Sequence, residues 1–199
     1  MAQDSSLPDF WCKRYLSDVM PWDAGGVPEE FMQYSQQLTP QQTIFIPGCG
    51  TGYEVGWLAE RGYAVEAIEF SPAALEMAQK VLGQFAQHIH AGDFFTHQPN
   101  QPFDWVYERA FLCALPRKMW TSYADRMAKI IAPNGVLAGY FFIGDQPKGP
   151  PFGISQAELT ALLSPHFVLE SDQASVAPLP VFAGKERWQV WRRCDNLSH

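Results

Sequence analysis

The pattern of apolar and polar positions predicts that strands and helices alternate along most of the chain. Short apolar runs, typical of buried strands, occur at 43–46, 64–70, 88–95, 103–110 and 136–143, with amphipathic helical segments between them. Two more apolar runs, 167–169 and 188–191, finish the chain, and we expect them to form an antiparallel pair. This order predicts an α/β fold: a doubly wound, seven-stranded, mostly parallel sheet with helices on both faces and one antiparallel strand.

Several helix starts are marked by capping residues. Ser71 followed by Pro72 is typical of an N-cap with proline at the first helical position. The sequence Ser155–Glu158 has the pattern of a capping box. Near the beginning of the chain, Asp9 is placed to cap a short helix over 10–16.

The first strand runs into a turn with three glycines at alternate positions, Gly48, Gly50 and Gly52. Glycine takes positive φ without strain and lets a ligand approach the backbone, and the helix N-terminus behind the loop favours a polar or anionic ligand group. Glu69 ends the second strand, about 20 residues further on, where α/β nucleotide folds place the acid that accepts ribose hydroxyls. Loop and acid together predict a nucleoside site.

The spacing of the glycines narrows the choice of ligand. In the dinucleotide fingerprint G-x-G-x-x-G the third glycine would stand at Tyr53, whereas here it comes one residue earlier, which disfavours an NAD-dependent oxidoreductase. The Gly-Lys-Ser/Thr of a Walker loop is absent from the sequence. S-adenosylmethionine, which binds such loops through its ribose and amino-acid tail, is the remaining candidate.

Polar residues also follow the third and fourth strands. Asp93 beside Phe94 can flank an adenine ring, or Asp93 can cap the following turn instead. Arg109 stands at the carboxyl end of the fourth strand, where central parallel strands meet the ligand crevice, so we expect it to face the site. The alternative for Arg109 is a fixed salt bridge to Glu108 or Asp104.

Three large aromatic residues, Trp11, Tyr15 and Trp22, precede the first core strand. Trp11 and Tyr15 are four residues apart and share one face of the expected helix. These residues are either a flap that covers the core or an aromatic lid over a bound cofactor, within an N-terminal helical segment of residues 1–40.

Composition and charge exclude several classes of protein. A chain of 199 residues is normally one domain, 1–199, and its 47% hydrophobic and 14% aromatic content excludes a disordered chain. The net charge of −7 and the lack of any Lys/Arg run disfavour nucleic acid as a partner. We expect a cytoplasmic protein without membrane contact, because the sequence has neither a basic start with an apolar run nor a membrane-length apolar stretch.

Cysteine and histidine positions give no indication of a metal. The histidines show no ligand spacing, and the cysteines show no C-x-x-C pair, so we expect reduced thiols and neither a zinc site nor disulfides. Cys49 and Cys113 lie in apolar surroundings and are expected to pack in the core rather than act as nucleophiles.

An ordered set of short motifs runs from about Phe10 to Trp191. Its members are Phe10–Tyr15 (FWCKRY), Pro21–Asp23 (PWD), Phe45–Gly50 (FIPGCG), Trp57–Gly62 (WLAERG), Glu69–Ser71 (EFS), Tyr107–Ala110 (YERA) and Gly149–Phe152 (GPPF). Together they resemble the thiopurine S-methyltransferase family in the broad sense, which includes halide, thiocyanate and thiol methyltransferases. The resemblance implies a Rossmann-like class I methyltransferase that uses S-adenosylmethionine, with an aromatic N-terminal segment over the cofactor.

The resemblance also implies roles for single residues. Glu69 is expected to bind the ribose hydroxyls, Gly48 the methionine tail, and Asp93 with Phe94 the adenine. Tyr15 stands where tryptophan is usual in the family. The full set of cofactor-binding positions that we expect is Trp11, Tyr15, Trp22, Gly48, Gly50, Glu69, Phe70, Asp93, Phe94 and Arg109.

The motifs combine two branches of the family, which leaves the acceptor open. Pro-Gly-Cys-Gly and Pro-Trp-Asp resemble the halide and thiocyanate branch, whereas Glu-Arg-Ala resembles a Tyr-Asp-Arg-Ala stretch of the bacterial thiopurine enzymes. The resemblance thus implies in-line methyl transfer to a small soft nucleophile, first of all sulfur in a thiopurine, thiol or thiocyanate, with halide, selenium or tellurium as further acceptors. Arg109 is the catalytic candidate, because its charge can lower the pKa of a thiol or hold an anion.

Two alternatives to this function remain open from the sequence. One is a methyltransferase with a nitrogen or carbon acceptor, and the other is a non-catalytic module that binds S-adenosylmethionine. For the methyltransferase we expect a small-molecule methyl acceptor as the partner and a monomeric protein.

Overall fold

The computed structural model describes residues 4–194, and seven strands in this part of the chain form one sheet. Residues 1–3 and 195–199, which the expected domain 1–199 includes, lie outside the described residues. The strands are β1 (Thr43–Pro47), β2 (Ala64–Glu69), β3 (Ile89–Ala91), β4 (Phe103–Arg109), β5 (Ile131–Phe142), β6 (Phe167–Ala174) and β7 (Glu186–Arg193).

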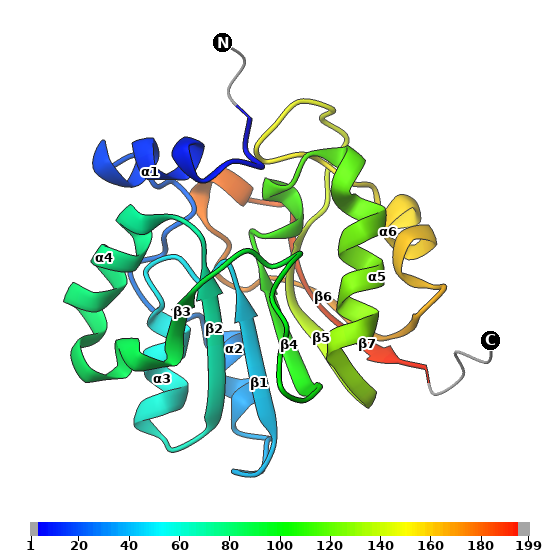
Figure 1. Cartoon of the computed structure of the whole chain (residues 1–199). Coiled ribbons are helices and arrows are strands. Elements are labelled where there is room, and N and C mark those ends of the chain that lie inside the picture. Colours follow the sequence, from blue (N-terminus) through cyan, green and yellow to red (C-terminus); the bar gives the residue numbers. More distant parts are fainter. Residues whose placement is uncertain (1–3, 195–199) are drawn as a thin grey trace.

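Their order in the sheet is β3-β2-β1-β4-β5-β7-β6 (Figure 1). Strands β1 to β5 run parallel to one another, whereas β7 is antiparallel to both of its neighbours, β5 and β6. The predicted seven-stranded, mostly parallel sheet with one antiparallel strand is therefore confirmed.

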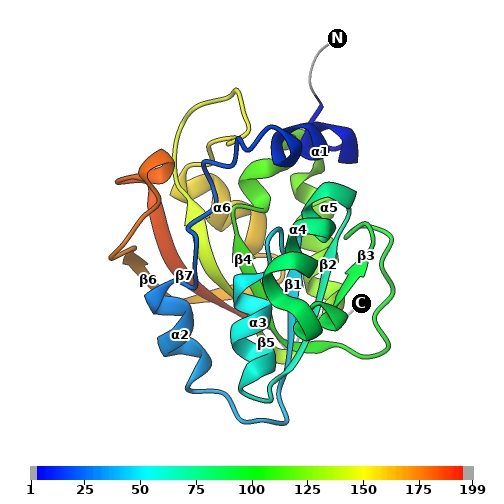
Figure 2. The same cartoon turned by 90° about the vertical axis from the view of Figure 1, so that its left-hand side faces the viewer.

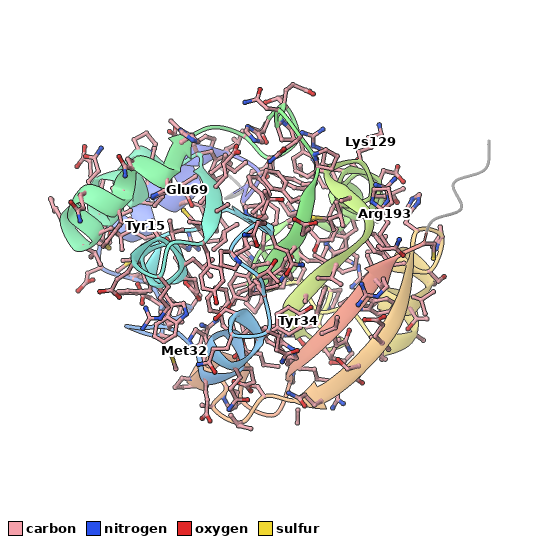
Figure 3. The ribbon with its side chains drawn as sticks, turned by 90° about the horizontal axis from the view of Figure 1, so that it is seen from below. Tyr15, Met32, Tyr34, Glu69, Lys129 and Arg193 are labelled. Carbon is pink, nitrogen blue, oxygen red and sulfur yellow. The ribbon has the colours of Figure 1, made fainter. Side chains whose placement is uncertain are left out.

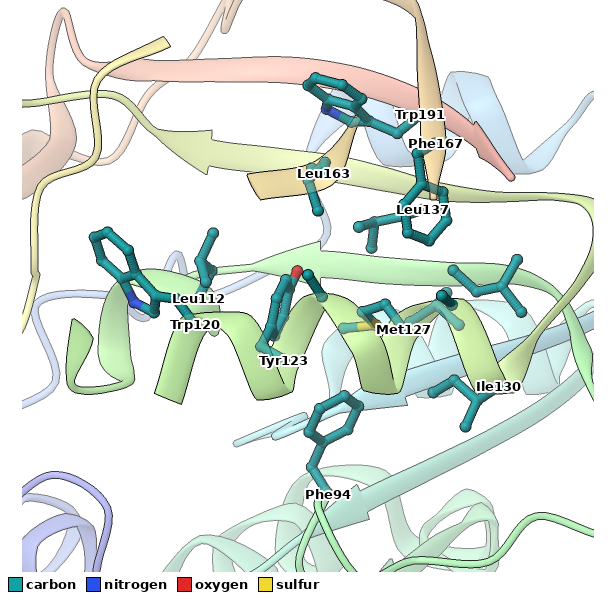
Figure 4. Packing of buried hydrophobic residues seen from close by; sticks show 14 of the residues in the cluster. Phe94, Leu112, Trp120, Tyr123, Met127, Ile130, Leu137, Leu163, Phe167 and Trp191 are labelled. Carbon is teal, nitrogen blue, oxygen red and sulfur yellow. The ribbon is translucent and has the colours of Figure 1, made fainter. Parts of the chain in front are cut away.

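Helices cover both faces of the sheet, as predicted. The α-helices are α1 (Pro8–Leu16), α2 (Glu29–Ser35), α3 (Tyr53–Glu60), α4 (Pro72–Leu82), α5 (Trp120–Ile130) and α6 (Gln156–Leu163), and short 3₁₀ turns are η1 (Gly83–His88), η2 (Leu112–Ala114), η3 (Arg117–Met119) and η4 (Pro180–Phe182). Phe31 of α2 and Leu58 of α3 are buried against one face. Met127 of α5 and Leu163 of α6 are buried against the other (Figure 4).

The strand order places a crevice at one end of the sheet. The chain leaves β1 toward β2 on one side and later returns to β4 on the other, with Ile44 opposite Trp105. The carboxyl ends of β1 and β4 therefore meet where the direction of strand order reverses, which is where open α/β sheets bind ligands. Helix α1 lies across this end of the molecule in both views (Figure 1 and Figure 2).

Two of the predicted helix caps are present, and one is wrong. The Ser71 hydroxyl accepts a hydrogen bond from the backbone N–H of Ala74, and the capping box of Ser155 and Glu158 is formed in both directions. Helix α1, however, begins at Pro8 rather than at Phe10, and Asp9 lies in its first turn instead of capping it. Proline is favoured at the first helical position, since its fixed φ is already helical and its missing N–H would have no partner there.

Strand lengths also differ from the apolar runs. The strand expected over 88–95 is reduced to Ile89–Ala91, because Asp93 accepts a hydrogen bond from the backbone N–H of Phe95 and turns the chain. Strands β6 and β7 extend well beyond their apolar runs, since they pair along most of their length. Within the part of the chain that the structure describes, no helix has the length and apolarity needed to cross a bilayer.

Candidate active site

A cavity of about 330 Å³ opens at the carboxyl ends of β1, β2 and β4, and residues of α1 form part of its wall. Its walls come from the N-terminal aromatic segment, the glycine loop, the end of β2 and the segment after β4. Tyr15 of α1 and Glu69 of β2 lie on the same side of the molecule in the view from below (Figure 3). Of the residues expected to bind the cofactor, the structure brings eight to this cavity: Trp11, Tyr15, Trp22, Gly48, Gly50, Glu69, Phe70 and Arg109.

The glycine loop has the backbone geometry that its sequence predicts. Gly48, Gly50 and Gly52 have φ values of 58°, 56° and 78°, in the left-handed region where a side chain is disfavoured. A Cβ atom on Gly50 would lie 2.6 Å from the hydroxyl oxygen of Tyr15, so α1 rests directly on the loop. Glycine is therefore favoured in this loop for two reasons: the positive φ of the turn and, at Gly50, the close approach of α1.

Glu69 is held rigidly at the edge of the loop. Its side chain is buried, with 5% of its surface exposed, and it accepts backbone hydrogen bonds from Gly50 (3.0 Å) and Ser71 (2.8 Å), one on each carboxylate oxygen. Burial raises the pKa of Glu69 above its ordinary value, against the effect of these two amides. Because each carboxylate oxygen has two acceptor sites, both oxygens can still receive a hydroxyl from a ligand.

The aromatic segment packs against itself and is tied to the glycine loop. The rings of Trp11 and Trp22 meet edge to face at 5.2 Å, and those of Tyr15 and Trp22 at 6.0 Å. Just after these rings, Asp23 accepts a hydrogen bond of 2.7 Å from the hydroxyl of Thr51 in the loop. The three rings line the cavity rather than only covering the core, as the lid interpretation requires.

Asp93 and Phe94 do not line the cavity. Asp93 is exposed, and its carboxylate accepts the N–H of Phe95, which is the turn-capping alternative that the sequence left open. Phe94 is buried and packs edge to face against Phe111 at 5.1 Å. Their role beside adenine stays a prediction.

Arg109 faces the cavity from the end of β4 and is nearly buried. Its guanidinium lies 3.4 Å from the carboxylate of Glu54 in α3 and 5.0 Å from the ring centre of Tyr140. Burial alone would lower the pKa of Arg109, but interactions with Tyr107, Glu54 and Glu186 raise it, so the side chain stays charged. Its buried Nε atom has no hydrogen-bond partner among the described residues.

The structural alternative for Arg109 named the wrong partners. Adjacent residues of a strand point to opposite faces, so Glu108 turns toward α5 while Arg109 turns toward α3. Asp104 accepts hydrogen bonds from the backbone N–H and the hydroxyl of Thr43 at the other end of β4. Glu54, which does pair with Arg109, lies more than 50 residues away in the sequence.

Sequence reasoning missed several residues of the cavity wall. Glu54 and Tyr107 share a hydrogen bond of 3.2 Å beside Arg109, and Asp23 and Thr51 connect the N-terminal aromatic segment to the glycine loop. One signal was available: Tyr107 and Arg109 are two residues apart on a strand and therefore share a face. Nothing in the local sequence indicates that Glu54 completes this group.

Two cysteines also line the cavity, Cys49 and Cys113. Burial raises the pKa of both thiols well above the ordinary value, so neither is a thiolate at neutral pH. In residues 4–194 we find no group of three or more histidine, cysteine or acidic side chains that could hold a metal ion.

Comparison with known proteins extends these observations. Residues 6–194 match the family model described as thiopurine S-methyltransferase (TPMT). The chain is 30% identical over 208 residues to a probable thiol methyltransferase 2 of Arabidopsis thaliana, with 99% of this chain and 89% of the relative covered. It is 29% identical over 175 residues to a thiopurine S-methyltransferase of Vibrio cholerae, with 78% of this chain and 80% of the relative covered.

A solved structure shares the fold. The crystal structure of the 1,6-didemethyltoxoflavin-N1-methyltransferase of Burkholderia thailandensis, with bound 1,6-didemethyltoxoflavin and S-adenosylhomocysteine, superposes with a TM-score of 0.75 at 18% identity, covering 96% of this chain and 88% of that one. The predicted Rossmann-like methyltransferase fold is thereby confirmed. Since the family model spans nearly all of the described residues, the chain belongs to the thiopurine S-methyltransferase family.

Proposed function

We propose that this protein transfers the methyl group of S-adenosylmethionine to the sulfur of a small soft nucleophile: a thiopurine, a thiol or thiocyanate. The observation that carries the proposal is that one cavity is lined both by a predicted cofactor site and by a buried, positively charged side chain. The glycine loop and Glu69 line one part of it, and Arg109, buried and charged, lines another. Halide, selenium and tellurium species are further acceptors of the same soft, anionic character.

The residues of the cavity fit an adenosyl cofactor. Glu69 keeps acceptor capacity on both oxygens for the two ribose hydroxyls, and its orientation is fixed by the amides of Gly50 and Ser71. Gly48 and Gly50, at positive φ, bend the loop so that it lines the cavity, where the methionine tail can approach its backbone. We therefore assign Glu69 and the glycine loop to the cofactor.

When bound, the cofactor would supply a methyl group activated by its positively charged sulfur; the acceptor sulfur would form a bond to the methyl carbon as the carbon–sulfonium bond breaks and S-adenosylhomocysteine leaves. The task left to the chain is to position the acceptor and keep it anionic. Arg109 can do both, because it lines the cavity and its charge lowers the pKa of a nearby thiol and attracts an anionic acceptor.

We propose that the N-terminal residues within 1–40 act as a lid over the bound cofactor. The support is that Trp11, Tyr15 and Trp22 line the cavity and that the Asp23–Thr51 hydrogen bond ties this segment to the glycine loop. Excluding water in this way strengthens electrostatic interactions inside the site.

The test is an assay of the purified full chain with radiolabelled S-adenosylmethionine against a thiopurine, an alkyl thiol, thiocyanate, iodide and a primary amine. We expect label in the sulfur acceptors. Turnover with the amine alone would reject the sulfur proposal. Cofactor binding by calorimetry without transfer to any acceptor would favour the non-catalytic alternative.

We also propose that the protein acts as a monomer in the cytoplasm. The support for the compartment is that Cys12, Cys49, Cys113 and Cys194 are free thiols, as a reducing compartment allows. Size-exclusion chromatography with light scattering tests the monomer, and cell fractionation tests the compartment.

A further inference from the structure

Glu108 is a buried carboxylate beside the cavity that the proposed reaction does not use. It is the penultimate residue of β4, and only 1% of its surface is exposed. Because neighbouring strand residues alternate between faces, Glu108 points away from Arg109 and into the core under α5. Burying a carboxylate is costly unless its oxygens are hydrogen-bonded, so its partners show what it does.

Three donors converge on this carboxylate. One oxygen accepts the backbone N–H groups of Phe111 and Leu112, both at 2.9 Å, and the other accepts the hydroxyl of Tyr123 at 2.6 Å. Tyr123 lies on the face of α5 that is turned toward the sheet (Figure 4). Glu108 thus binds the chain three and four residues after itself and ties that turn to a helix.

The turn that Glu108 holds has an unfavourable backbone. Ala110, between Glu108 and the bound amides, has a φ of 54°, in the left-handed region that a residue with a Cβ occupies at a cost of roughly 1 kcal/mol. Such a conformation persists only where its surroundings impose it. The hydrogen bonds that Glu108 accepts from the N–H groups of Phe111 and Leu112 hold Ala110 in this conformation.

The same turn forms a wall of the cavity. Ala110, Phe111, Cys113 and Leu115 all line it. The ring of Phe111 lies so close to the glycine loop that a Cβ atom on Gly48 would be 2.6 Å from it. The segment also holds the next loop, because the backbone oxygen of Cys113 accepts the N–H of Phe152 at 2.7 Å.

From these contacts we infer that Glu108 is a positioning residue: it fixes the segment 110–115 so that this wall and the neighbouring Arg109 present the acceptor correctly for methyl transfer. The inference rests on the proposed function for its catalytic part. Its structural part, the ordering of two amides by one carboxylate, holds whatever the acceptor is. The cofactor side of the cavity depends on other bonds, those of Glu69 with Gly50 and Ser71.

The experiment compares Glu108→Ala and Glu108→Gln, with Tyr123→Phe as the matched control. Glutamine keeps an oxygen that can accept both amides, alanine removes every acceptor, and Tyr123→Phe removes only the third donor. Kinetics with the best acceptor, the dissociation constant of S-adenosylmethionine by calorimetry, and amide exchange of Phe111 and Leu112 by NMR are measured for each.

We expect Glu108→Ala to lower kcat/KM for the acceptor by roughly 10- to 100-fold, since small misplacements of a site are that costly, with a much smaller change in cofactor affinity. The two amides should exchange faster in Glu108→Ala but stay protected in Glu108→Gln and Tyr123→Phe, which should also retain most of the activity. If Glu108→Ala does not fold, Glu108→Asp, whose shorter side chain withdraws the carboxylate, takes its place with the same expected results.

The inference would be overturned if Glu108→Ala had the amide exchange and the kinetics of the wild type. It would also be overturned if Tyr123→Phe lost as much activity as Glu108→Ala. Amide exchange also separates the two proposals. An inactive wild-type protein whose Phe111 and Leu112 amides depend on Glu108 would remove the methyl-transfer proposal and, with it, the catalytic part of this inference, while the structural part would stand.

Discussion

The hydroxyl of Thr51 donates a 2.7 Å hydrogen bond to the carboxylate of Asp23, and this bond joins the glycine loop to the aromatic segment. Asp23 directly follows Trp22, and its other oxygen accepts the backbone N–H of Gly25. The bond therefore fixes the end of the segment that carries three rings of the cavity wall.

Thr51→Val should weaken cofactor binding by about 1 kcal/mol, because it replaces the donor with a methyl group of similar shape and releases the segment from the loop. Isothermal titration calorimetry with S-adenosylmethionine measures the change. Thr51→Ser, which keeps the hydroxyl, is the control and should bind as the wild type does. Equal affinity in all three proteins would mean that the bond does not order the lid.

Glu69→Ala should weaken cofactor affinity by on the order of 1 to 3 kcal/mol, since the ribose hydroxyls lose their charged acceptor. Isothermal titration calorimetry with S-adenosylmethionine is again the measurement. Circular dichroism checks that the chain stays folded when the glycine loop loses its hydrogen bond to Glu69. Glu69→Gln, which keeps one acceptor oxygen, should have a cofactor affinity between those of the wild type and Glu69→Ala. Undiminished affinity in the alanine variant would remove Glu69 from the site.

Arg109→Ala should leave cofactor binding largely intact and lower methyl transfer by on the order of 10- to 100-fold, because the acceptor loses a buried, charged donor. Arg109→Lys, which keeps the charge without the planar donor group, should recover part of the rate. Steady-state kinetics against the acceptor panel provides the measurement. If the alanine variant transfers methyl groups as fast as the wild type, Arg109 has only its structural contact with Glu54.

Gly50→Ala should abolish or strongly reduce cofactor binding, because the added Cβ meets the Tyr15 hydroxyl at 2.6 Å and forces α1 away from the loop. Gly62→Ala is the matched control: Gly62 also has a positive φ, 78°, but a Cβ there would contact nothing within 4 Å. Both variants should lose roughly 1 kcal/mol of stability from backbone strain, but only Gly50→Ala should lose affinity. Similar affinity in the two variants would contradict the contact between Tyr15 and the loop.

The buried carboxyl of Glu108 should make the stability of the protein depend on pH. Burial, although opposed by the hydrogen bonds from Tyr123, Leu112 and Phe111, raises its pKa from 4.5 to about 7, and Cys113 is a further titratable group that interacts with it. Between these two values the unfolded chain releases the proton and the folded chain retains it. This group's contribution to the free energy of unfolding therefore falls as pH rises from about 4.5 to 7, by at most on the order of 3 kcal/mol.

Urea unfolding at a series of pH values measures this dependence. In Glu108→Gln, which cannot titrate, the curve of unfolding free energy against pH should lose the downward slope in that range. Other groups contribute equally to both proteins and cancel in the difference. A difference between the two curves that is constant from pH 4.5 to 7 would show that Glu108 does not titrate there.

The sheet and most of its helices could be predicted from sequence because the relevant signals are local. Apolar runs, the Ser71–Pro72 cap and the capping box of Ser155 all act within a few residues. The same locality explains the errors. Leu7 rather than Asp9 precedes α1 because Pro8 favours the first helical position, and β3 ends early because Asp93 forms a hydrogen bond within its own turn.

The candidate site was predictable only in part for the same reason. Gly50 and Glu69 belong to one strand–loop–helix–strand unit, and their spacing indicates a nucleoside site by itself. The pair of Glu54 and Arg109 depends on the packing of α3 against the end of β4, which no local pattern specifies. The role of Glu108 was hidden as well, since its partner Tyr123 lies on a separate helix.

The strand order places the residues proposed to bind the cofactor and those proposed to bind the acceptor on different sides of the switch point. The residues proposed to bind the nucleoside lie at the ends of β1 and β2 on one side of the switch point, whereas the turn after β4 and the loop that is hydrogen-bonded to it through Phe152 lie on the other side. Substitutions in those later segments can reshape the pocket for a new acceptor while the adenosyl half keeps its bonds. A designer who wants a different methylated product should therefore randomise the chain after Arg109 and leave residues 43–71 untouched.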